Sequence, residues 1–554
     1  MGLPPPLAPT RSLIIIAQGL PLLNFNSHVN IAVMRLLRAV TQVTIYSLAL
    51  SFFLFFFLCL IRFDLSNDYL VLSYLEAAMG RATKLFLLVS SISLFVSSNC
   101  VAETTDCRAP GINDLRELPA HLRQADIVSG KIPLSKVISD GLTLMITDFN
   151  RCDGRGRPGA TGNPIPQKRP IPPELIQFFT RTSGQEAMSC AACHNQPQSL
   201  GSGDHAANVL QFPAVAVIPA VREWFTPTFS PNFPERNTPT IFGTGPVELL
   251  GREMTEDLQG IKADAQQRAS KSGKNVSASL DTKGINFGSI TAFPNGSVDT
   301  SGVVGVDPDL IVKPFQRKGA LVSLREFAIT ASNQHMGMQA VERFGSGDFD
   351  DDGVKDELSI GDATAMALRQ ATLPIPERTA PPEGMENEAT RGEELFNTIG
   401  CANCHVPKLP LRSTVFCDPN PFNPPGNLTD QSQRVCVDLK GVTGLNSNMV
   451  PLFSDLKRHV ICDARKPHFC SDPPNHLQVT DRLFPVPVDE FITTKLWDMG
   501  NSAPYGHRGD ESTLYEAIVD HGGEATTAEQ AYETLSSEDQ LSVVIFLRTL
   551  KAPI

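Results

Sequence analysis

Apolar residues at helical spacing gather in three segments toward the C-terminal end of the chain. Residues 388–399 carry an apolar face that runs into a glycine, and residues 537–550 begin with the capping-box-like sequence S-E-D-Q. Residues 512–523 begin at a second capping box and end at a pair of glycines. The long alternation of apolar and polar residues that is typical of half-buried strands does not appear. The pattern therefore predicts a mainly α fold.

Three polar segments divide this pattern. Residues 153–173 form a Gly/Pro-rich loop, and residues 260–305 are polar enough to be a long surface excursion. The Pro-rich stretch 373–387 is the best candidate for a linker between domains. We therefore expect an N-terminal domain at 103–372 with long loop insertions and a C-terminal domain at 388–554.

Residues 1–102 form a leader with two apolar runs. The run at 43–61 carries no charge and is long enough to span a bilayer. A shorter run follows basic residues and, counted from Met79, has the three regions of a secretory signal peptide over 79–102. Two crossings would return the rest of the chain to the cytoplasm, so only one should operate. Either residues 1–78 are an upstream extension or 43–61 is a membrane anchor, and both predict an exported, periplasmic protein.

The composition is that of a globular protein with an acidic balance. At 554 residues, of which 42% are hydrophobic, the chain has room for roughly two to four domains with substantial cores. A net charge of −12 argues against nucleic acid and against an anionic membrane surface as partners.

The pattern C-x-x-C-H occurs twice along the chain. Each copy offers two thiols one helical turn apart, followed directly by an imidazole. Covalent haem attachment uses this arrangement, because the thiols bond the vinyl groups and the histidine ligates the iron. A zinc site made from two C-x-x-C pairs is the alternative, but zinc does not need the histidine after both pairs. We therefore expect two covalently bound haems c, held by Cys190, Cys193 and His194 and by Cys401, Cys404 and His405.

Six further cysteines follow the leader outside these motifs. They fit an oxidising compartment and up to three disulfides. Short loops favour the pairs 417–436 and 462–470, although other connectivities remain open. The six are Cys107, Cys152, Cys417, Cys436, Cys462 and Cys470.

The sixth ligand of each iron decides whether it transfers electrons or binds a substrate. In the predicted helix at 512–523, His521 shares one face with three apolar residues. It is either a second ligand of the iron bound by His405 or a core histidine bonded to a backbone carbonyl. With His521 bound, that iron would be six-coordinate and would only transfer electrons. His507, in the turn A-P-Y-G-H-R-G, is a ligand, a propionate donor or an exposed residue.

For the first haem, no ligand pattern is decisive, which is compatible with an open position of the kind that peroxide chemistry needs. Glu248 is an acid in an otherwise apolar run, and a carboxylate over an open haem could move a proton between the two peroxide oxygens. The alternative is a salt-bridged or surface glutamate. Other residues that could reach an iron are His205, Met254, His335, Met336 and Met338.

The acidic run at 348–358 matches the first half of a calcium-binding loop. Asp348, Asp350 and Asp352 precede a glycine, and Asp356 falls at the ninth position. The bidentate glutamate that closes such loops is missing from its place. Calcium is thus one expectation, and a solvated acidic turn is the other.

Several ordered blocks resemble one family of bacterial enzymes. They are S-C-A-A-C-H-N-Q-P, R-N-T-P-T-I-F-G-T-G, D-D-D-G-V-K-D-E-L-S, G-C-A-N-C-H, L-W-D-M-G-N-S-A-P-Y-G-H-R-G and T-L-Y-E-A-I-V-D-H-G-G-E-A. Together they resemble the di-haem oxidoreductases labelled peroxidases or thiol oxidoreductases. These are relatives of the di-haem cytochrome c peroxidases and of the di-haem enzyme that matures tryptophan tryptophylquinone. The likeness covers about residues 103–554.

This resemblance implies two cytochrome c-like domains, with a peroxidatic haem in the N-terminal domain and an electron-transfer haem in the C-terminal one. His521 falls where the peroxidases carry Met and the maturation enzyme carries Tyr, and a histidine would lower the potential relative to Met. The family also usually reads H-D-G where this chain has His507-Arg508-Gly509.

The sequence thus predicts an exported di-haem c-type oxidoreductase with peroxidase-like chemistry at the haem of His194. Electrons from a redox partner protein would enter through the haem of His405 and His521, and a small oxidant such as hydrogen peroxide would be reduced. The alternative is a non-catalytic electron-transfer cytochrome in which both irons are six-coordinate.

Overall fold

The computed structural model describes residues 120–155, 187–204, 207–208, 235–348, 354–470 and 486–551. These residues belong to one compact unit, which spans Thr105–Ile554. Within the described ranges, no helix is both long and apolar enough to cross a membrane. The expected membrane span at 43–61 and signal peptide at 79–102 lie outside the described residues.

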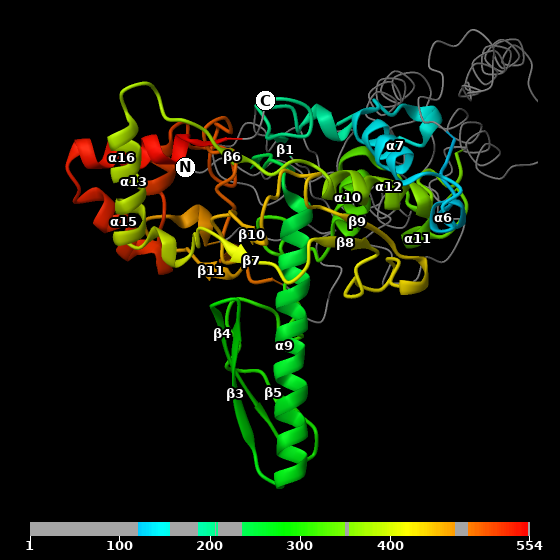
Figure 1. Cartoon of the computed structure of the whole chain (residues 1–554), viewed down its shortest axis with the longest axis horizontal. Coiled ribbons are helices and arrows are strands. Elements are labelled where there is room, and N and C mark those ends of the chain that lie inside the picture. The colour runs from blue at the N-terminus through cyan, green and yellow to red at the C-terminus, as the bar shows by residue number, and fades with distance from the viewer. Residues whose placement is uncertain are drawn as a thin grey trace, which may run out of the picture. The chain divides into compact units, whose positions relative to one another are not determined.

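The described part of the chain contains helices and mostly short strands (Figure 1). The helices are α6 (Gln124–Val128), α7 (Leu134–Ile146), α9 (Thr244–Ser272), α10 (Leu324–Ala331), α11 (Val341–Phe344), α12 (Ile360–Ala371), α13 (Glu386–Thr398), α14 (Leu514–Val519), α15 (Thr526–Glu533) and α16 (Ser537–Arg548). The strands are β1 (Ala207–Asn208), β2 (Glu235–Arg236), β3 (Val276–Thr282), β4 (Ile285–Ala292), β5 (Val298–Asp299), β6 (Glu377–Arg378), β7 (Leu409–Pro410), β8 (Val415–Asp418), β9 (Val435–Asp438), β10 (Met449–Val450), β11 (Arg458–Val460), β12 (Glu490–Ile492) and β13 (Leu550–Lys551).

The first hydrophobic core combines helices from before the second C-x-x-C-H motif with strands from after it. α7 packs on α12 at Gly141, where a Cβ atom would lie only 2.1 Å from the carbonyl oxygen of Ala365. Phe416 of β8 and Val437 of β9 are buried in the same core. Strands that follow the predicted linker at 373–387 therefore pack with the helices that precede it.

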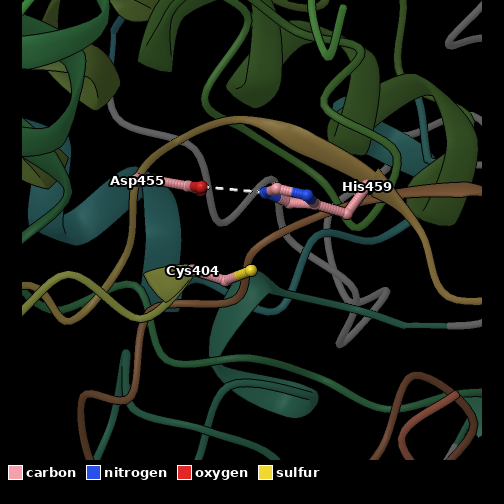
Figure 2. A group of neighbouring side chains, drawn as sticks. All are labelled: Cys404, Asp455 and His459. Atoms are coloured by element: carbon pink, nitrogen blue, oxygen red, sulfur yellow. Dashed lines mark hydrogen bonds and ion pairs between the residues drawn. The ribbon is translucent and has the colours of Figure 1, made fainter. Parts of the chain in front are cut away.

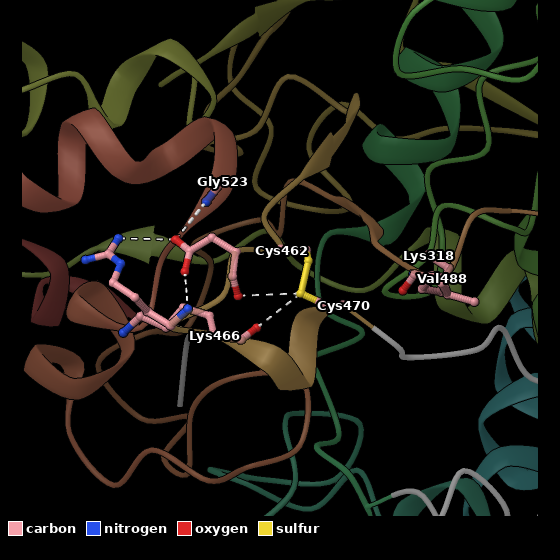
Figure 3. The surroundings of a disulfide bond; sticks show 8 residues. Lys318, Cys462, Lys466, Cys470, Val488 and Gly523 are labelled. Atoms are coloured by element: carbon pink, nitrogen blue, oxygen red, sulfur yellow. Dashed lines mark hydrogen bonds and ion pairs between the residues drawn. A yellow bond between two sulfur atoms is a disulfide. The ribbon is translucent and has the colours of Figure 1, made fainter.

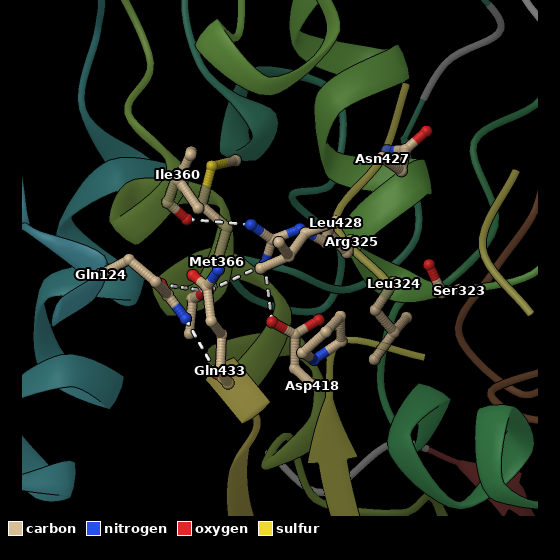
Figure 4. A network of polar contacts seen from close by, with 12 residues as sticks. Gln124, Ser323, Leu324, Arg325, Ile360, Met366, Asp418, Asn427, Leu428 and Gln433 are labelled. Atoms are coloured by element: carbon tan, nitrogen blue, oxygen red, sulfur yellow. Dashed lines mark hydrogen bonds and ion pairs between the residues drawn. The ribbon is translucent and has the colours of Figure 1, made fainter. Parts of the chain in front are cut away.

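A buried polar network ties these strands to the helices (Figure 4). Arg325 of α10 is fully buried and donates to Asp418 of β8 at 2.6 Å and to Glu342 of α11 at 2.5 Å. Its guanidinium also donates to the hydroxyl of Thr364 in α12, which in turn donates to Gln124 of α6. A buried arginine is stable only when its donors are satisfied, so this network fixes α10, α12 and β8 against one another.

α9 continues past the first core and carries a three-stranded antiparallel sheet in the order β3-β4-β5 (Figure 1). Leu280 of β3 and Phe287 of β4 are fully buried. The surface excursion expected at 260–305 is therefore an ordered helix and sheet. The sequence does not predict this sheet. β3 reads V-S-A-S-L-D-T, so small and polar residues occupy many of its alternating inner and outer positions.

The second core lies around the second motif. α13 and α16 pack at Gly392, where a Cβ atom would lie 1.9 Å from the carbonyl oxygen of Ser542. The ring centres of Phe396 and Phe546 are 5.4 Å apart, and Phe453 packs against both. The helices predicted at 388–399 and 537–550 are confirmed as α13 and α16.

The two disulfides favoured by the sequence are also confirmed. Cys417 and Cys436 are directly opposite each other on β8 and β9, and Cys462 pairs with Cys470. Cys152 is disulfide-bonded as well, whereas Cys107 lies outside the described residues.

Candidate functional site

The two C-x-x-C-H motifs have the same backbone conformation. Each forms a 3-10 turn, at Cys190–Ala192 and at Cys401–Asn403. In each, the backbone N–H of the histidine donates to the carbonyl of the first cysteine at 3.0 Å. Each turn carries two thiols and an imidazole on a single short segment, so both copies offer the same set of groups.

None of the four motif thiols forms a disulfide. Burial is the main cause that raises the pKa of Cys190 to about 12 and that of Cys401 to about 11, so both thiols are protonated at neutral pH. Among the described residues, the groups close enough to share a metal ion do not join cysteines of the two motifs. The zinc alternative needs thiolates from both C-x-x-C pairs at one ion, and this arrangement does not bring them together.

His194 is held by a loop that closes directly after the first motif. Its Nδ1 lies 3.1 Å from the carbonyl oxygen of Gly201, and the backbone N–H of Leu200 donates to the carbonyl of His194 at 2.8 Å. Burial and the nearby His335 lower the pKa of His194 to about 4. A neutral imidazole with Nδ1 bonded to a carbonyl is the usual state of a metal-ligating histidine.

Among the residues that the sequence offers as a second ligand for the first haem, His335 contacts the segment that leads into the first C-x-x-C-H motif. It lies in a π-helical turn, Ser332–Met336, that directly follows α10. Its carbonyl accepts from the backbone N–H of Ala187, which stands three residues before Cys190, at 3.3 Å. Such turns are frequent at functional sites. Met254, Met336 and Met338 are buried in the first core, and His205 lies outside the described residues.

His405 and His521 lie together in the second core. Their ring centres are 6.3 Å apart and their planes meet at 65°. Nδ1 of His405 is 3.1 Å from the carbonyl oxygen of Phe453, and Nδ1 of His521 is 2.8 Å from that of Ala517. Burial and the neighbouring His521 lower the pKa of His405 to about 4, so its imidazole is neutral at pH 7.

The segment that carries His521 differs locally from the sequence prediction. The capping box of Thr513 and Glu516 is present, but α14 ends at Val519 with Asp520 as its C-cap. His521 therefore stands beyond the helix rather than on its inner face. The pair of glycines that follows it ends the helix earlier than the apolar spacing suggests.

A third histidine of the second site carries a charge. His459 of β11 donates to Asp455 and to Glu524 at 2.8 Å each and lies beside Cys404 (Figure 2). Burial opposes the charge, but hydrogen bonds to Asp455, Cys404 and Glu524 outweigh it and raise the pKa of His459 to about 11. Asp455 stands only four residues before His459, but Glu524 stands 65 residues after it, so the local sequence does not show the full set of partners.

His507 is packed among aromatic rings rather than exposed. Its ring centre is 4.8 Å from that of Phe469 and 5.1 Å from that of Phe491. Asn237 links its turn to the first core, because the Asn237 backbone donates to the His507 carbonyl at 3.1 Å and its side chain donates to Pro504 at 2.6 Å. Its role as ligand or propionate donor stays a prediction.

Glu248 of α9 is buried rather than on the surface. Its carboxylate accepts from the backbone N–H of Leu324 at 2.7 Å and from the side chain of Asn420 at 3.0 Å. Burial, with a further contribution from Asp418, raises the pKa of Glu248 to about 8. The side chain is therefore a neutral acid at pH 7, a form that can donate a proton.

The expected calcium loop is described only in part. Asp350 and Asp352 lie outside the described residues. Asp356 accepts from the backbone N–H of Gly347 at 3.0 Å, which closes the segment around Asp348. Calcium at these aspartates stays a prediction.

Comparison with known proteins does not identify a family for this chain. No protein-family model matches the chain. No curated protein matches it either. One similar solved structure is hydrazine synthase of Kuenenia stuttgartiensis, with a TM-score of 0.19 and 16% identity over 34% of this chain and 55% of that chain. The match thus spans about half the length of that neighbour, and at this TM-score it does not indicate a shared fold.

Proposed function

We propose that the chain is an exported di-haem c-type oxidoreductase that reduces a small peroxide. The haem held by Cys190, Cys193 and His194 is the reacting group, and the haem held by Cys401, Cys404 and His405 receives electrons from a redox partner protein. Two cytochrome c-like domains, a periplasmic location and an N-terminal membrane anchor as an alternative to a signal peptide belong to the same proposal.

The separation of His405 and His521 carries this proposal. A metal–imidazole bond is about 2.0 Å long and a ring nitrogen lies about 1.1 Å from its ring centre, so two imidazoles on opposite sides of one iron have centres about 6.2 Å apart. The ring centres of His405 and His521 are 6.3 Å apart. Hydrogen bonds occupy Nδ1 of both rings, so Nε2 is the atom with which each ring would hold a metal. His405 and His521 would therefore hold one haem iron between them.

The cysteines fit the same group. Thioether attachment needs a pair of thiols that are not joined by a disulfide, one turn apart and directly before the histidine. Both motifs meet this condition, although other described cysteines are oxidised to disulfides. Because the other cysteines in the described ranges are in disulfides and these four are not, a different covalent use for the four is the best explanation.

At the first site, the residues of the chain supply protons and positioning. A bound haem supplies an iron that can pass electrons to an oxidant at an open position. Reduction of hydrogen peroxide consumes two electrons and two protons and yields two waters. We propose that His335, which neighbours His194, takes up and returns the proton that moves between the peroxide oxygens. Glu248 is a buried neutral acid between Val247 and Leu249 of the first core, and we propose it as a further proton source.

At the second site, His459 holds positive charge next to the attachment cysteine Cys404. A fixed cation close to a redox centre favours the reduced form, which carries one more electron. The pairing of His459 with Asp455 and Glu524 keeps that charge in place across the neutral pH range.

A non-catalytic electron-transfer cytochrome is the alternative, because a half-buried His335 could itself occupy the sixth position of the first iron. Electron paramagnetic resonance and cyanide titration of the oxidised, half-reduced and fully reduced protein separate the two. The proposed enzyme has one haem per chain that is high-spin or binds cyanide in at least one of these states. Two haems that stay low-spin and bind no cyanide in all three states would leave the electron-transfer protein as the function.

A further inference from the structure

A second cluster of metal-ligating side chains lies directly beside His521. His468, Glu511 and Asp520 each offer one ligand atom, and these atoms lie within 4.8 Å of one another. Nε2 of His468 is 2.8 Å from Oδ2 of Asp520. None of the three belongs to a C-x-x-C-H motif, and the proposed function uses none of them.

Glu511 is a buried acid with one oxygen that has no partner. Its side chain is only 9% exposed, and its Oε2 has no hydrogen-bond partner. This oxygen sits against Gly506, where a Cβ atom would lie 1.8 Å from it. A carboxylate oxygen buried without a donor calls for either a proton or a cation beside it.

The loop that carries His468 is anchored from two sides. The Cys462–Cys470 disulfide closes it, and the carboxylate of Asp463 accepts from the backbone N–H of Gly523 at 3.3 Å (Figure 3). The loop is thereby joined to the chain two residues after His521. A ligand fixed in this way loses little conformational entropy when it binds an ion.

The other two ligands are also positioned by the backbone. Asp520 is the C-cap of α14. The carbonyl of Glu511 accepts from the backbone N–H of Tyr505 at 2.7 Å, across the turn that carries His507. The ring of His507 stacks on that of His468 with centres 5.7 Å apart and planes at 11°, which limits the rotation of the ligand ring.

Two nitrogen-bearing side chains lie beside Asp520. Nε2 of His468 is 2.8 Å from its Oδ2, and Nζ of Lys466 is 3.4 Å from its Oδ1. Neither pairs with Oε2 of Glu511, which has no hydrogen-bond partner.

We infer that His468, Glu511 and Asp520 form a binding site for a divalent transition metal of the zinc class. One imidazole nitrogen and two carboxylates are a donor set that zinc accepts, with a fourth position for water. The histidine disfavours calcium and magnesium, which prefer oxygen ligands alone. Because Asp520 directly precedes His521, the ion would hold the segment that carries the proposed axial ligand.

Isothermal titration of the full haem-loaded chain with zinc chloride, after treatment with EDTA and its removal, tests the site at pH 7. The wild type should bind one zinc per chain. Glu511→Gln keeps the size of the side chain but replaces a carboxylate oxygen that can ligate a metal. It should weaken zinc binding at least tenfold. Glu533→Gln, on the exposed end of α15, is the matched control and should bind as the wild type does.

His468→Gln provides a second variant, and the absorption spectrum of the second haem reports whether each variant is folded. Both variants should lose zinc affinity while the haem spectrum at saturating EDTA stays that of the wild type. The inference is overturned if the wild type takes up no zinc, or if folded Glu511→Gln and His468→Gln bind it unchanged. The haem count, measured independently, tests the proposed function, so failure of one leaves the other standing.

Discussion

The imidazole rings of His405 and His521 lie with their centres 6.3 Å apart although 115 residues separate them in the chain. His405 is fixed by the carbonyl of Phe453 and His521 by that of Ala517. No single segment produces this pairing. It arises because α13, α16 and the turn after α14 converge on one small core.

The proposed reaction at the first site should depend on His335. Replacing His335 by Ala should slow the reaction of the half-reduced protein with hydrogen peroxide by about 10²–10⁴-fold, because proton transfer loses its donor and acceptor. Cyanide binding to the first haem should persist. Stopped-flow absorbance measures both, and Val128→Ala, an exposed residue at the end of α6, is the control. Unchanged peroxide kinetics would exclude His335 from the reaction.

Glu248 should make stability depend on pH. Its pKa rises from 4.5 to about 8 on burial, so the folded state holds a proton that the unfolded state releases. Its contribution to the free energy of unfolding is fully present below pH 4.5 and is lost as the pH rises through about 8. Glu248→Gln removes this titration. Urea unfolding at several pH values should show the wild type losing stability relative to Glu248→Gln between these limits, and a constant difference would contradict the assignment.

The charge on His459 should tune the second haem. At pH 7 a pKa of about 11 keeps the imidazolium charged, so His459→Gln removes one positive charge. The midpoint potential of the second haem should fall by on the order of tens of millivolts. Spectroelectrochemical titration measures the shift, with the exposed Lys131→Gln as a charge-matched control. A potential that does not move, or that rises, would mean that the Asp455 and Glu524 carboxylates set the local field alone.

Sequence reasoning was most successful where local signals are strong. The motifs, the helices α13 and α16 and the two short-range disulfides follow from spacing, capping and loop length. It failed where partners come from distant segments. The cluster of His468, Glu511 and Asp520 joins three loops, and sequence spacing carries no sign of it.

The sheet on α9 was missed for a different reason. Small residues hold some of its inner positions, such as the partly buried Ala278 and the buried Ala292, so the hydrophobic pattern that identifies strands is weak. The early end of α14 at Val519 likewise depends on the glycines that follow His521 rather than on the apolar spacing before them.

The central claim is that His405 and His521 saturate one iron and leave the other haem to react. Electron paramagnetic resonance of oxidised His521→Ala, beside the wild type and Tyr515→Phe on the exposed face of α14, tests it most directly. The account predicts that the low-spin signal of the second haem converts to high-spin only in His521→Ala, while cyanide still binds the first haem. If His521→Ala keeps the low-spin signal of the wild type, His521 is a core histidine, and the assignment of the two sites is wrong.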